Sequence, residues 1–413
     1  MKVIKKVLPS GLTVLLVPMK DSASVTVDVS VRAGSYYEDK ATSGISHFLE
    51  HMCFKGTTNR PLLGQISREL DQIGAQANAA TGNETTSYYV KARPQHVNQV
   101  LDIVSDIYLH STFPEIEIEK EKGVVCDEIA MYEDDPQSIA SDLLRRTLYG
   151  DTYFGWDIAG TKENVRAFTR GTIIAYRTKH YVASKTIVTI TGNIDPKDIL
   201  KKVTILFKPI TSKIAVTLSK KAPTLGTQHN AHKERDTEQT HVRIAFKGFA
   251  RNHADKYTVA ILATVLGGGM SSRLFTKLRE EMGVSYYIGA SHRSYAVYGM
   301  FGIYTGVSNN AVDAATNAIR TECTRLTKEK VNDTELNKIK EMYTASIFMG
   351  LETSSALADY VSTFALNQEE VLTPKQLEAK FRLVTPADIM RVAKTIFKEK
   401  EEYIVTVGKG VKK

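Results

Sequence analysis

Residues 44–55 read Gly-Ile-Ser-His-Phe-Leu-Glu-His-Met-Cys-Phe-Lys, and the order of apolar and polar residues in this stretch indicates its fold. The apolar residues of its centre are Ile45, Phe48, Leu49 and Met52. Their three- and four-residue spacing is that of one face of a helix, which would lie against a core. The stretch therefore predicts a helix over residues 44–55 whose other face carries the polar side chains.

His47, Glu50 and His51 form an HxxEH motif within this predicted helix. Residues four apart lie on one helix face, so the two imidazoles can converge on a single metal ion. Glu50 is near enough to reach a metal-bound water without being a ligand itself. Catalytic zinc usually has three protein ligands and one open position, so a third ligand must come from elsewhere. The alternative is that both histidines are ordinary surface or core residues.

A second predicted helix, over residues 114–132, offers candidates for the third ligand. Most of its acidic side chains are expected to be solvated. Glu121 and Glu128 are seven residues apart, hence two turns apart on nearly the same face. One of them can bind the metal while the other supports a ligand histidine. Their spacing alone does not distinguish the two roles.

This pattern, an HxxEH motif followed 77 residues after His51 by Glu128, resembles the pitrilysin/insulinase family of zinc metallopeptidases. The resemblance extends over essentially the whole chain, in the single-length form similar to mitochondrial processing peptidase subunits. It implies one Zn²⁺ per chain, bound by His47, His51 and Glu128. It also implies that Glu50 is the general base and that Glu121 is a supporting residue next to the ligands.

Two further segments resemble substrate-binding parts of the same family. Residues 77–81, Ala-Asn-Ala-Ala-Thr, resemble an edge strand that pairs with the substrate backbone, which implies that Asn78 and Ala79 bind substrate. Residues 274–286 resemble the signature of the family's second half, which implies that Arg279 and Tyr286 contact substrate near the scissile bond. The alternative is that Arg279 pairs with a nearby glutamate and Tyr286 fills the edge of a core.

The length of 413 residues exceeds what one hydrophobic core usually organises, so two domains are expected. Residues 211–235 have little periodicity and predict a linker, whose first part could still add an edge strand. The two halves look like degenerate copies, because residues 118–142 align by eye with residues 336–359. We therefore predict a zinc-binding domain at 1–210 and a homologous domain without metal residues at 236–413.

Periodicity predicts strands and helices in both halves. In the first half the predicted strands are 3–7, 12–17, 24–33, 75–79, 87–92 and 186–191, and the predicted helices are 44–55, 61–72, 94–111, 114–132, 136–149 and one after Pro196. In the second half the predicted strands are 241–246, 284–290 and 300–307, and the predicted helices are 254–266, 271–281 and others beyond. The expected fold class is α+β: two homologous α/β domains, each a mostly antiparallel sheet covered by helices, joined by a linker. By resemblance, the whole is half of a clamshell.

Composition excludes several other functions. The 54 basic and 46 acidic residues give a net charge of +8 that is spread along the chain, which argues against nucleic-acid binding. The sequence contains no 18-residue apolar run for a membrane span and no signal-peptide pattern at its start. Three widely spaced cysteines fit a reducing compartment, so a cytoplasmic location is expected.

The expected function is that of a zinc endopeptidase that hydrolyses short or unfolded peptides in an enclosed chamber. Two alternatives stay open: a non-catalytic assembly or scaffold subunit, and a dedicated peptidase that processes precursors. In double-length relatives the zinc lies in one half and the Arg/Tyr pair in the other. A homodimer is therefore expected, in which each chain supplies Arg279 and Tyr286 to the zinc of the other, unless a partner subunit of the same fold takes that place.

Overall fold

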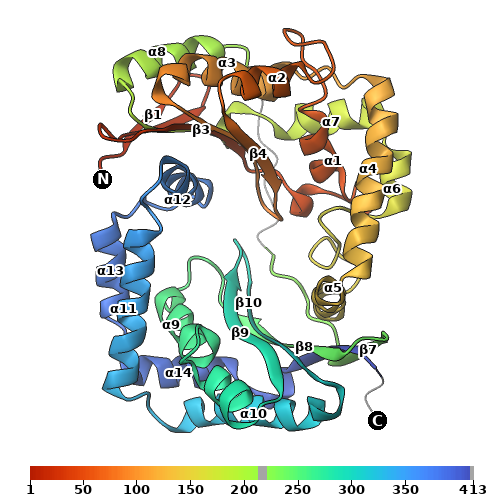
Figure 1. Ribbon diagram of the computed structural model, residues 1–413, viewed down its shortest axis with the longest axis vertical. Helices are drawn as coiled ribbons and strands as arrows, with labels where there is room; N and C mark the ends of the chain where they lie inside the picture. Colours follow the sequence, from red (N-terminus) through yellow and green to blue (C-terminus); the bar gives the residue numbers. More distant parts are fainter. Residues whose placement is uncertain (213–220, 410–413) are drawn as a thin grey trace. The chain divides into compact units, whose positions relative to one another are not determined.

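The structure is a computed structural model that describes residues 1–212 and 221–409 of the chain (Figure 1). Residue contacts divide the chain into two compact units. The first unit comprises Met1–Ile129, Trp156–Leu218 and Phe348–Thr373, and the second comprises Ala130–Gly155, Ser219–Ile347 and Pro374–Lys413. No helix in the described ranges is both long enough and apolar enough to cross a lipid bilayer.

The first unit is built on a six-stranded sheet, as far as the described residues show, in the order β1-β2-β6-β3-β5-β4. Its strands are β1 (Ile4–Val7), β2 (Thr13–Pro18), β3 (Val25–Val31), β4 (Gln76–Thr81), β5 (Thr86–Ala92) and β6 (Thr186–Gly192). Neighbours are antiparallel except for β2 and β6, which are parallel. The predicted opening hairpin and the predicted strands of this half are confirmed.

The helices of the first unit lie on both faces of this sheet. They are η1 (Ser35–Tyr37), α1 (Ile45–Met52), α2 (Gln65–Gln72), η2 (Pro94–His96), α3 (Val97–His110), α4 (Glu115–Asp134, of which the last turn belongs to the second unit), α6 (Lys162–Ala167), α7 (Arg170–His180), η3 (Ala183–Lys185), α8 (Pro196–Leu206) and α12 (Ser354–Leu366). Figure 1 shows α3 and α8 on one side of the sheet and α12 on the other. α6 and α7 have no counterpart among the predicted elements.

Strand β3 shows how α12 belongs to the first unit. Its sequence, Val-Thr-Val-Asp-Val-Ser-Val, alternates, which is typical of a strand with one wet face. All seven residues are nevertheless buried. The valines face the core that contains α1 and α3, and the polar face is covered by α12. Ser362 Oγ donates to Asp28 Oδ1 at 2.9 Å, and Ser354 Oγ lies 2.9 Å from Thr26 Oγ1.

The second unit is built, within the described residues, on a five-stranded sheet in the order β7-β11-β8-β10-β9. Its strands are β7 (Asn230–Glu234), β8 (Gln239–Gly248), β9 (Ser285–Ser294), β10 (Gly299–Ser308) and β11 (Tyr403–Gly408). Its helices are α5 (Pro136–Tyr149), α9 (Lys256–Gly267), the π-helix η4 (Phe275–Glu281), η5 (Asn309–Ala311), α10 (Val312–Lys328), α11 (Asp333–Met349, which ends in the first unit), α13 (Pro374–Arg382), α14 (Pro386–Ile396) and η6 (Glu399–Glu401).

Two predictions for the second half need correction, and one of its strands was not predicted. β7 lies inside the predicted linker 211–235, where it pairs in parallel with β11. The possible edge strand in the first part of that linker falls largely on residues outside the described ranges. β11 itself has no predicted counterpart. The predicted helix 271–281 is a π-helix over Phe275–Glu281, in which the N–H of Met282 bonds to the carbonyl of Lys277, five residues back.

The two sheets share one topology apart from β1, which has no counterpart among the described strands of the second sheet. In each, the first and last strands of the repeat run parallel, as β2–β6 and β7–β11 do, and the order β6-β3-β5-β4 corresponds to β11-β8-β10-β9. The predicted fold class is therefore confirmed: two homologous α/β domains with mostly antiparallel sheets.

The compact units are not the contiguous segments 1–210 and 236–413, however. α5 packs on β11 and β8 of the second unit, and α12 packs on β6 and β3 of the first. Each half of the chain thus contributes one helix to the sheet of the other half.

Candidate metal centre

Helix α1 is fixed to the core by the apolar face that its spacing predicts. Ile45, Phe48, Leu49 and Met52 are fully buried. The N-cap residue Gly44 has a left-handed backbone with φ of 96°, and a Cβ atom there would lie only 2.5 Å from the carbonyl oxygen of Ala159. Gly44 therefore fits this position, but it offers no side chain to satisfy the first N–H groups of the helix.

Glu38 supplies that missing cap. Its Oε2 atom accepts a hydrogen bond from the N–H of Gly44 and its Oε1 atom accepts one from the N–H of Ser46, both at 2.8 Å. Burial raises the pKa of Glu38 to about 7, although these hydrogen bonds act in the opposite direction. A carboxylate at this end also favours the helix dipole. The orientation of the HxxEH helix thus depends on a residue nine positions before its first histidine.

The side chains of His47, His51 and Glu128 converge on one point. The Nε2 atoms of the two histidines are 3.2 Å apart, and each lies 3.6 Å from Glu128 Oε2. The side chains are 13%, 22% and 24% exposed, respectively, so solvent reaches them. A search of the described residues for side chains placed to hold a metal ion gives this group of three.

This donor set fits a zinc ion. Two imidazole nitrogens and one carboxylate oxygen are common zinc ligands, and tetrahedral donors about 2.0–2.1 Å from zinc lie about 3.3 Å from one another. The observed separations are close to that value. Burial lowers the pKa of His47, and the neighbouring His51 lowers it further, which favours the neutral ring that a metal needs.

Glu121 lies on the other side of the His51 ring. Its Oε1 atom is 2.9 Å from His51 Nδ1, and its Oε2 atom is 2.5 Å from Lys55 Nζ. Burial acts to raise the pKa of Glu121, but the hydrogen bonds from His51 and Lys55 outweigh it and lower the pKa. With Nδ1–H donating to Glu121, the Nε2 lone pair of His51 points toward Glu128.

Glu50 stands beside this group and touches the end of strand β4. Its Oε2 atom accepts a hydrogen bond from Thr81 Oγ1 at 2.5 Å. Burial raises the pKa of Glu50, and the Thr81 hydrogen bond lowers it in part. The sequence predicts Glu50 at this place, but neither Thr81 nor Glu38. The signal for Glu38 is an acidic residue six positions before a glycine N-cap that cannot cap itself.

Asn78 and Ala79 lie on β4, which is the edge strand of its sheet and pairs only with β5 among the described strands. Asn78 is exposed and Ala79 is half-buried. The N–H of Ala79 donates to the side-chain oxygen of Asn78 at 2.9 Å. Because β4 packs against α1 and ends at Thr81, a strand added to its free edge would run next to Glu50.

Arg279 and Tyr286 belong to the second unit, and both structural alternatives for them are wrong. Among the described residues, Arg279 pairs with no glutamate: its Nη1 atom donates to the carbonyl of Ser285 at 2.8 Å and weakly to that of Tyr286. Tyr286 is 62% exposed rather than part of a core. Both side chains therefore lie at the surface of the second unit, at the start of β9.

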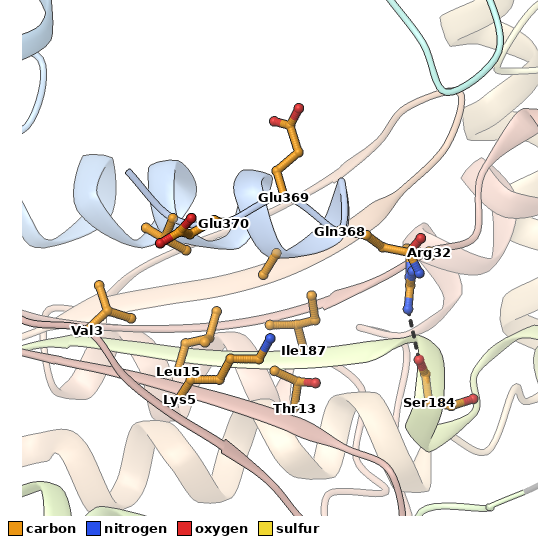
Figure 2. Close-up of a pocket in the computed structure, with 12 residues that line it drawn as sticks. Val3, Lys5, Thr13, Leu15, Arg32, Ser184, Ile187, Gln368, Glu369 and Glu370 are labelled. Carbon is orange, nitrogen blue, oxygen red and sulfur yellow. Dashed lines mark hydrogen bonds between the residues drawn. The ribbon is translucent and has the colours of Figure 1, made fainter. Parts of the chain in front are cut away.

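A cavity of about 550 Å³ lies elsewhere in the first unit, where β1, β2 and β6 meet the segment after α12. Figure 2 shows its charged residues Lys5, Arg32, Glu369 and Glu370, with Arg32 hydrogen-bonded to the carbonyl of Ser184. The cavity lining contains both charge signs and none of the predicted site residues.

Known proteins resemble this chain in sequence. The sequence pattern of the insulinase family (peptidase family M16) matches residues 13–162, and that of the peptidase M16 inactive domain matches residues 167–343. An uncharacterized zinc protease from Bacillus subtilis is 36% identical over 84% of this chain and 84% of its own length. The probable mitochondrial-processing peptidase subunit beta of Arabidopsis thaliana is 28% identical over 97% of this chain and 77% of its own length.

A solved structure has the same fold. The crystal structure of a protease from Helicobacter pylori superposes with a TM-score of 0.92 and covers 98% of this chain and 99% of that chain. Its sequence identity is 22%, so the likeness concerns the fold alone.

Proposed function

The chain belongs to the insulinase family, peptidase family M16, and on this premise we propose that it is a zinc-dependent endopeptidase. The observation that carries the proposal is the convergence of His47, His51 and Glu128, with Glu50 beside them. We assign the first three as ligands of one Zn²⁺ per chain and Glu121 as the residue that orients His51. Glu50 is assigned as the general base.

A zinc ion bound here would supply a Lewis acid that lowers the pKa of a water molecule and polarises a scissile carbonyl. The chain's own residues would transfer the proton and orient the ligands. Glu50 accepts the proton of the attacking water and passes it to the leaving amine, a contribution that is typically about 10²–10⁴-fold in rate. Glu121 keeps the Nδ1–H of His51 engaged, so that its Nε2 atom remains a ligand.

Short or unfolded peptides are the proposed substrates. The free edge of β4 supports this, since strand addition recognises the main chain and tolerates many side chains. Asn78 and Ala79 would make these backbone contacts. The enclosed chamber, the cytoplasmic location and the substrate contacts of Arg279 and Tyr286 stay predictions. So does the homodimer in which those two residues act at the zinc of the other chain.

A dedicated precursor-processing peptidase is the second candidate, because one relative is named as a mitochondrial-processing peptidase subunit. That name also makes a partner subunit of the same fold an alternative to the homodimer. Digestion of a peptide library separates the two functions: a processing enzyme would cut a small subset with a shared site, and a general oligopeptidase would cut many.

The proposal is tested on the purified protein alone, by its metal content and its hydrolysis of a quenched fluorescent peptide mixture. We expect about one zinc per chain and hydrolysis that a chelator abolishes and added zinc restores. A protein that binds zinc but cleaves no peptide would instead be a non-catalytic assembly subunit or a chain that needs a partner subunit of the same fold.

A further inference from the structure

Thr81 makes the contact with Glu50 that nothing in the HxxEH motif provides. The two residues lie 31 positions apart, and the Thr81 hydroxyl donates to Glu50 Oε2 at 2.5 Å. We propose that Thr81 is a positioning residue for the general base: it holds Oε2 and leaves Oε1 to take the proton from water. The inference rests on the proposed function and assigns a role that the motif itself does not contain.

The hydrogen bond is suited to fixing one carboxylate orientation. The terminal torsion of a glutamate is broad and roughly two-fold, so a free carboxylate exchanges its two oxygens easily. A hydroxyl donating to an ionised oxygen forms a short and strong hydrogen bond. Threonine is also stiff about its first side-chain torsion, so the donor is itself well placed. The Thr81 hydroxyl has no second hydrogen-bond partner in the described ranges.

The backbone around Thr81 is held tightly in place. Thr81 ends β4 at the tip of the β4–β5 hairpin, where the carbonyl of Gly82 accepts from the N–H of Ser35 at 3.2 Å. The carbonyl of Asn83 accepts from the N–H of Tyr36 at 2.8 Å. A Cβ atom at Gly34 would lie 2.4 Å from the Gly82 carbonyl oxygen, so the two backbones need a glycine to approach this closely.

The same segment then continues into the cap of the metal-binding helix. Residues 34–37 hold the hairpin tip, and Glu38 follows them directly and caps α1 through Gly44 and Ser46. Thr81 and Glu50 are therefore anchored to one continuous stretch of backbone. This shared anchor sets the distance between the donor and the base independently of any bound ligand.

The test compares Thr81→Val, which removes the hydroxyl but keeps the branched shape, with Thr81→Ser, which keeps the hydroxyl. Thr85→Val in the same hairpin is the matched control, because the Thr85 side chain has no hydrogen bond to a described residue. We expect Thr81→Val to lower kcat by about 10- to 100-fold with little change in KM. Zinc content and melting temperature should be unchanged. Thr81→Ser should recover most of the rate, and Thr85→Val should match the wild type.

Crystal structures of the wild type and Thr81→Val give a readout that does not depend on activity. We expect one Glu50 carboxylate orientation in the wild type and a rotated or divided one in the variant. An active wild type with an equally active Thr81→Val variant overturns the inference, as does an unchanged Glu50 in the two crystals. Loss of zinc in Thr81→Val would make Thr81 a structural residue instead. A wild type that cleaves nothing would overturn the proposed function, and the crystals would still decide the Thr81 contact.

Discussion

The Nδ1 atom of His51 lies 2.9 Å from Oε1 of Glu121, while the Nε2 atom of the same ring faces Glu128. We therefore expect Glu128→Ala to lose zinc, as His47→Ala and His51→Ala do. Glu121→Ala should keep zinc with an affinity about 10- to 100-fold weaker, the usual cost of removing a residue that orients a ligand.

Competition with a chromogenic chelator measures these affinities. Glu119→Ala is the control in the same helix, because Glu119 is exposed and pairs only with Lys122 among the described residues. If Glu121→Ala removed the metal and Glu128→Ala kept it, the two roles would have to be exchanged.

Glu50→Gln should abolish peptide hydrolysis and leave zinc bound at near wild-type stoichiometry. Glutamine keeps the size of the side chain but cannot accept the proton of the attacking water. Metal analysis and a peptide assay on the same sample check both halves of the prediction. Substantial activity, or loss of zinc, would contradict the assignment of Glu50 as base rather than ligand.

Glu38→Ala should destabilise the protein by on the order of 2 kcal/mol, because two N–H groups at the start of α1 lose their acceptors in a buried place. Glu38→Gln, which keeps one oxygen, should fall between that variant and the wild type. Thermal melting measures the loss, and chelator competition should show weaker zinc binding in the same order. An alanine variant that melts like the wild type would show that the cap contributes nothing.

The stability of the first unit should depend on pH through Asp28. Burial raises its pKa from the ordinary 3.8 to about 7, although hydrogen bonds from Ser30 and Ser362 lower it in part. The folded state therefore keeps a proton that the unfolded state releases between about pH 4 and pH 7. The contribution of Asp28 to the free energy of unfolding is greatest at about pH 4 and below. It falls as the pH rises to about 7 and is constant at higher pH.

Asp28→Asn removes this dependence, since the amide oxygen can still accept from both serines. We expect the variant to melt several degrees above the wild type at pH 8 and close to it near pH 4, because roughly 2–4 °C corresponds to 1 kcal/mol in a unit of this size. Melting curves across that range, recorded for both proteins, provide the measurement. A temperature difference that does not vary with pH would contradict the raised pKa.

In the expected homodimer, Arg279 and Tyr286 of one chain act at the zinc of the other chain, which we call a composite site. A composite site predicts complementation between inactive chains. A Glu50→Gln chain and a chain carrying both Arg279→Ala and Tyr286→Ala should each be nearly inactive alone. After subunit exchange, half of the dimers would be mixed with one intact site each, so about a quarter of the wild-type activity should return. Mass spectrometry verifies the exchange, and no recovery after proven exchange would exclude the composite site.

The sequence predicts helix α1 and the placement of its two histidines on one face well, because helical periodicity and the four-residue histidine spacing are local properties. The choice between Glu121 and Glu128 is different. They share a helix face, so only the position of that face relative to the His51 ring distinguishes them, and the ring's position depends on tertiary packing. Thr81 cannot be predicted from spacing for the same reason, since its partner Glu50 lies 31 residues away along the chain. Glu38 lies only six residues before Gly44, but its capping role depends on the conformation of the segment between them.

The absence of β7 from the prediction has a different cause. β7 reads Asn-Ala-His-Lys-Glu, is mostly exposed and pairs only with β11 among the described strands, so it carries almost no apolar signal. In β3, by contrast, alternation correctly indicates a strand but wrongly suggests a wet face. The serines of α12 cover that face. The sequence of β3 alone cannot predict that a helix more than 300 residues away packs on it.

The exchange of α5 and α12 between the halves constrains the order in which this chain can fold on the ribosome. A sheet face that includes Asp28 is completed only by residues 354–366, which are translated long after the last strand of that sheet, β6. At about 5–20 residues per second, the nascent first unit waits on the order of 10–30 s with that face uncovered. During this interval the uncovered face of the sheet can bind other polypeptides. Chaperones that cover this face would therefore act before the chain is released from the ribosome.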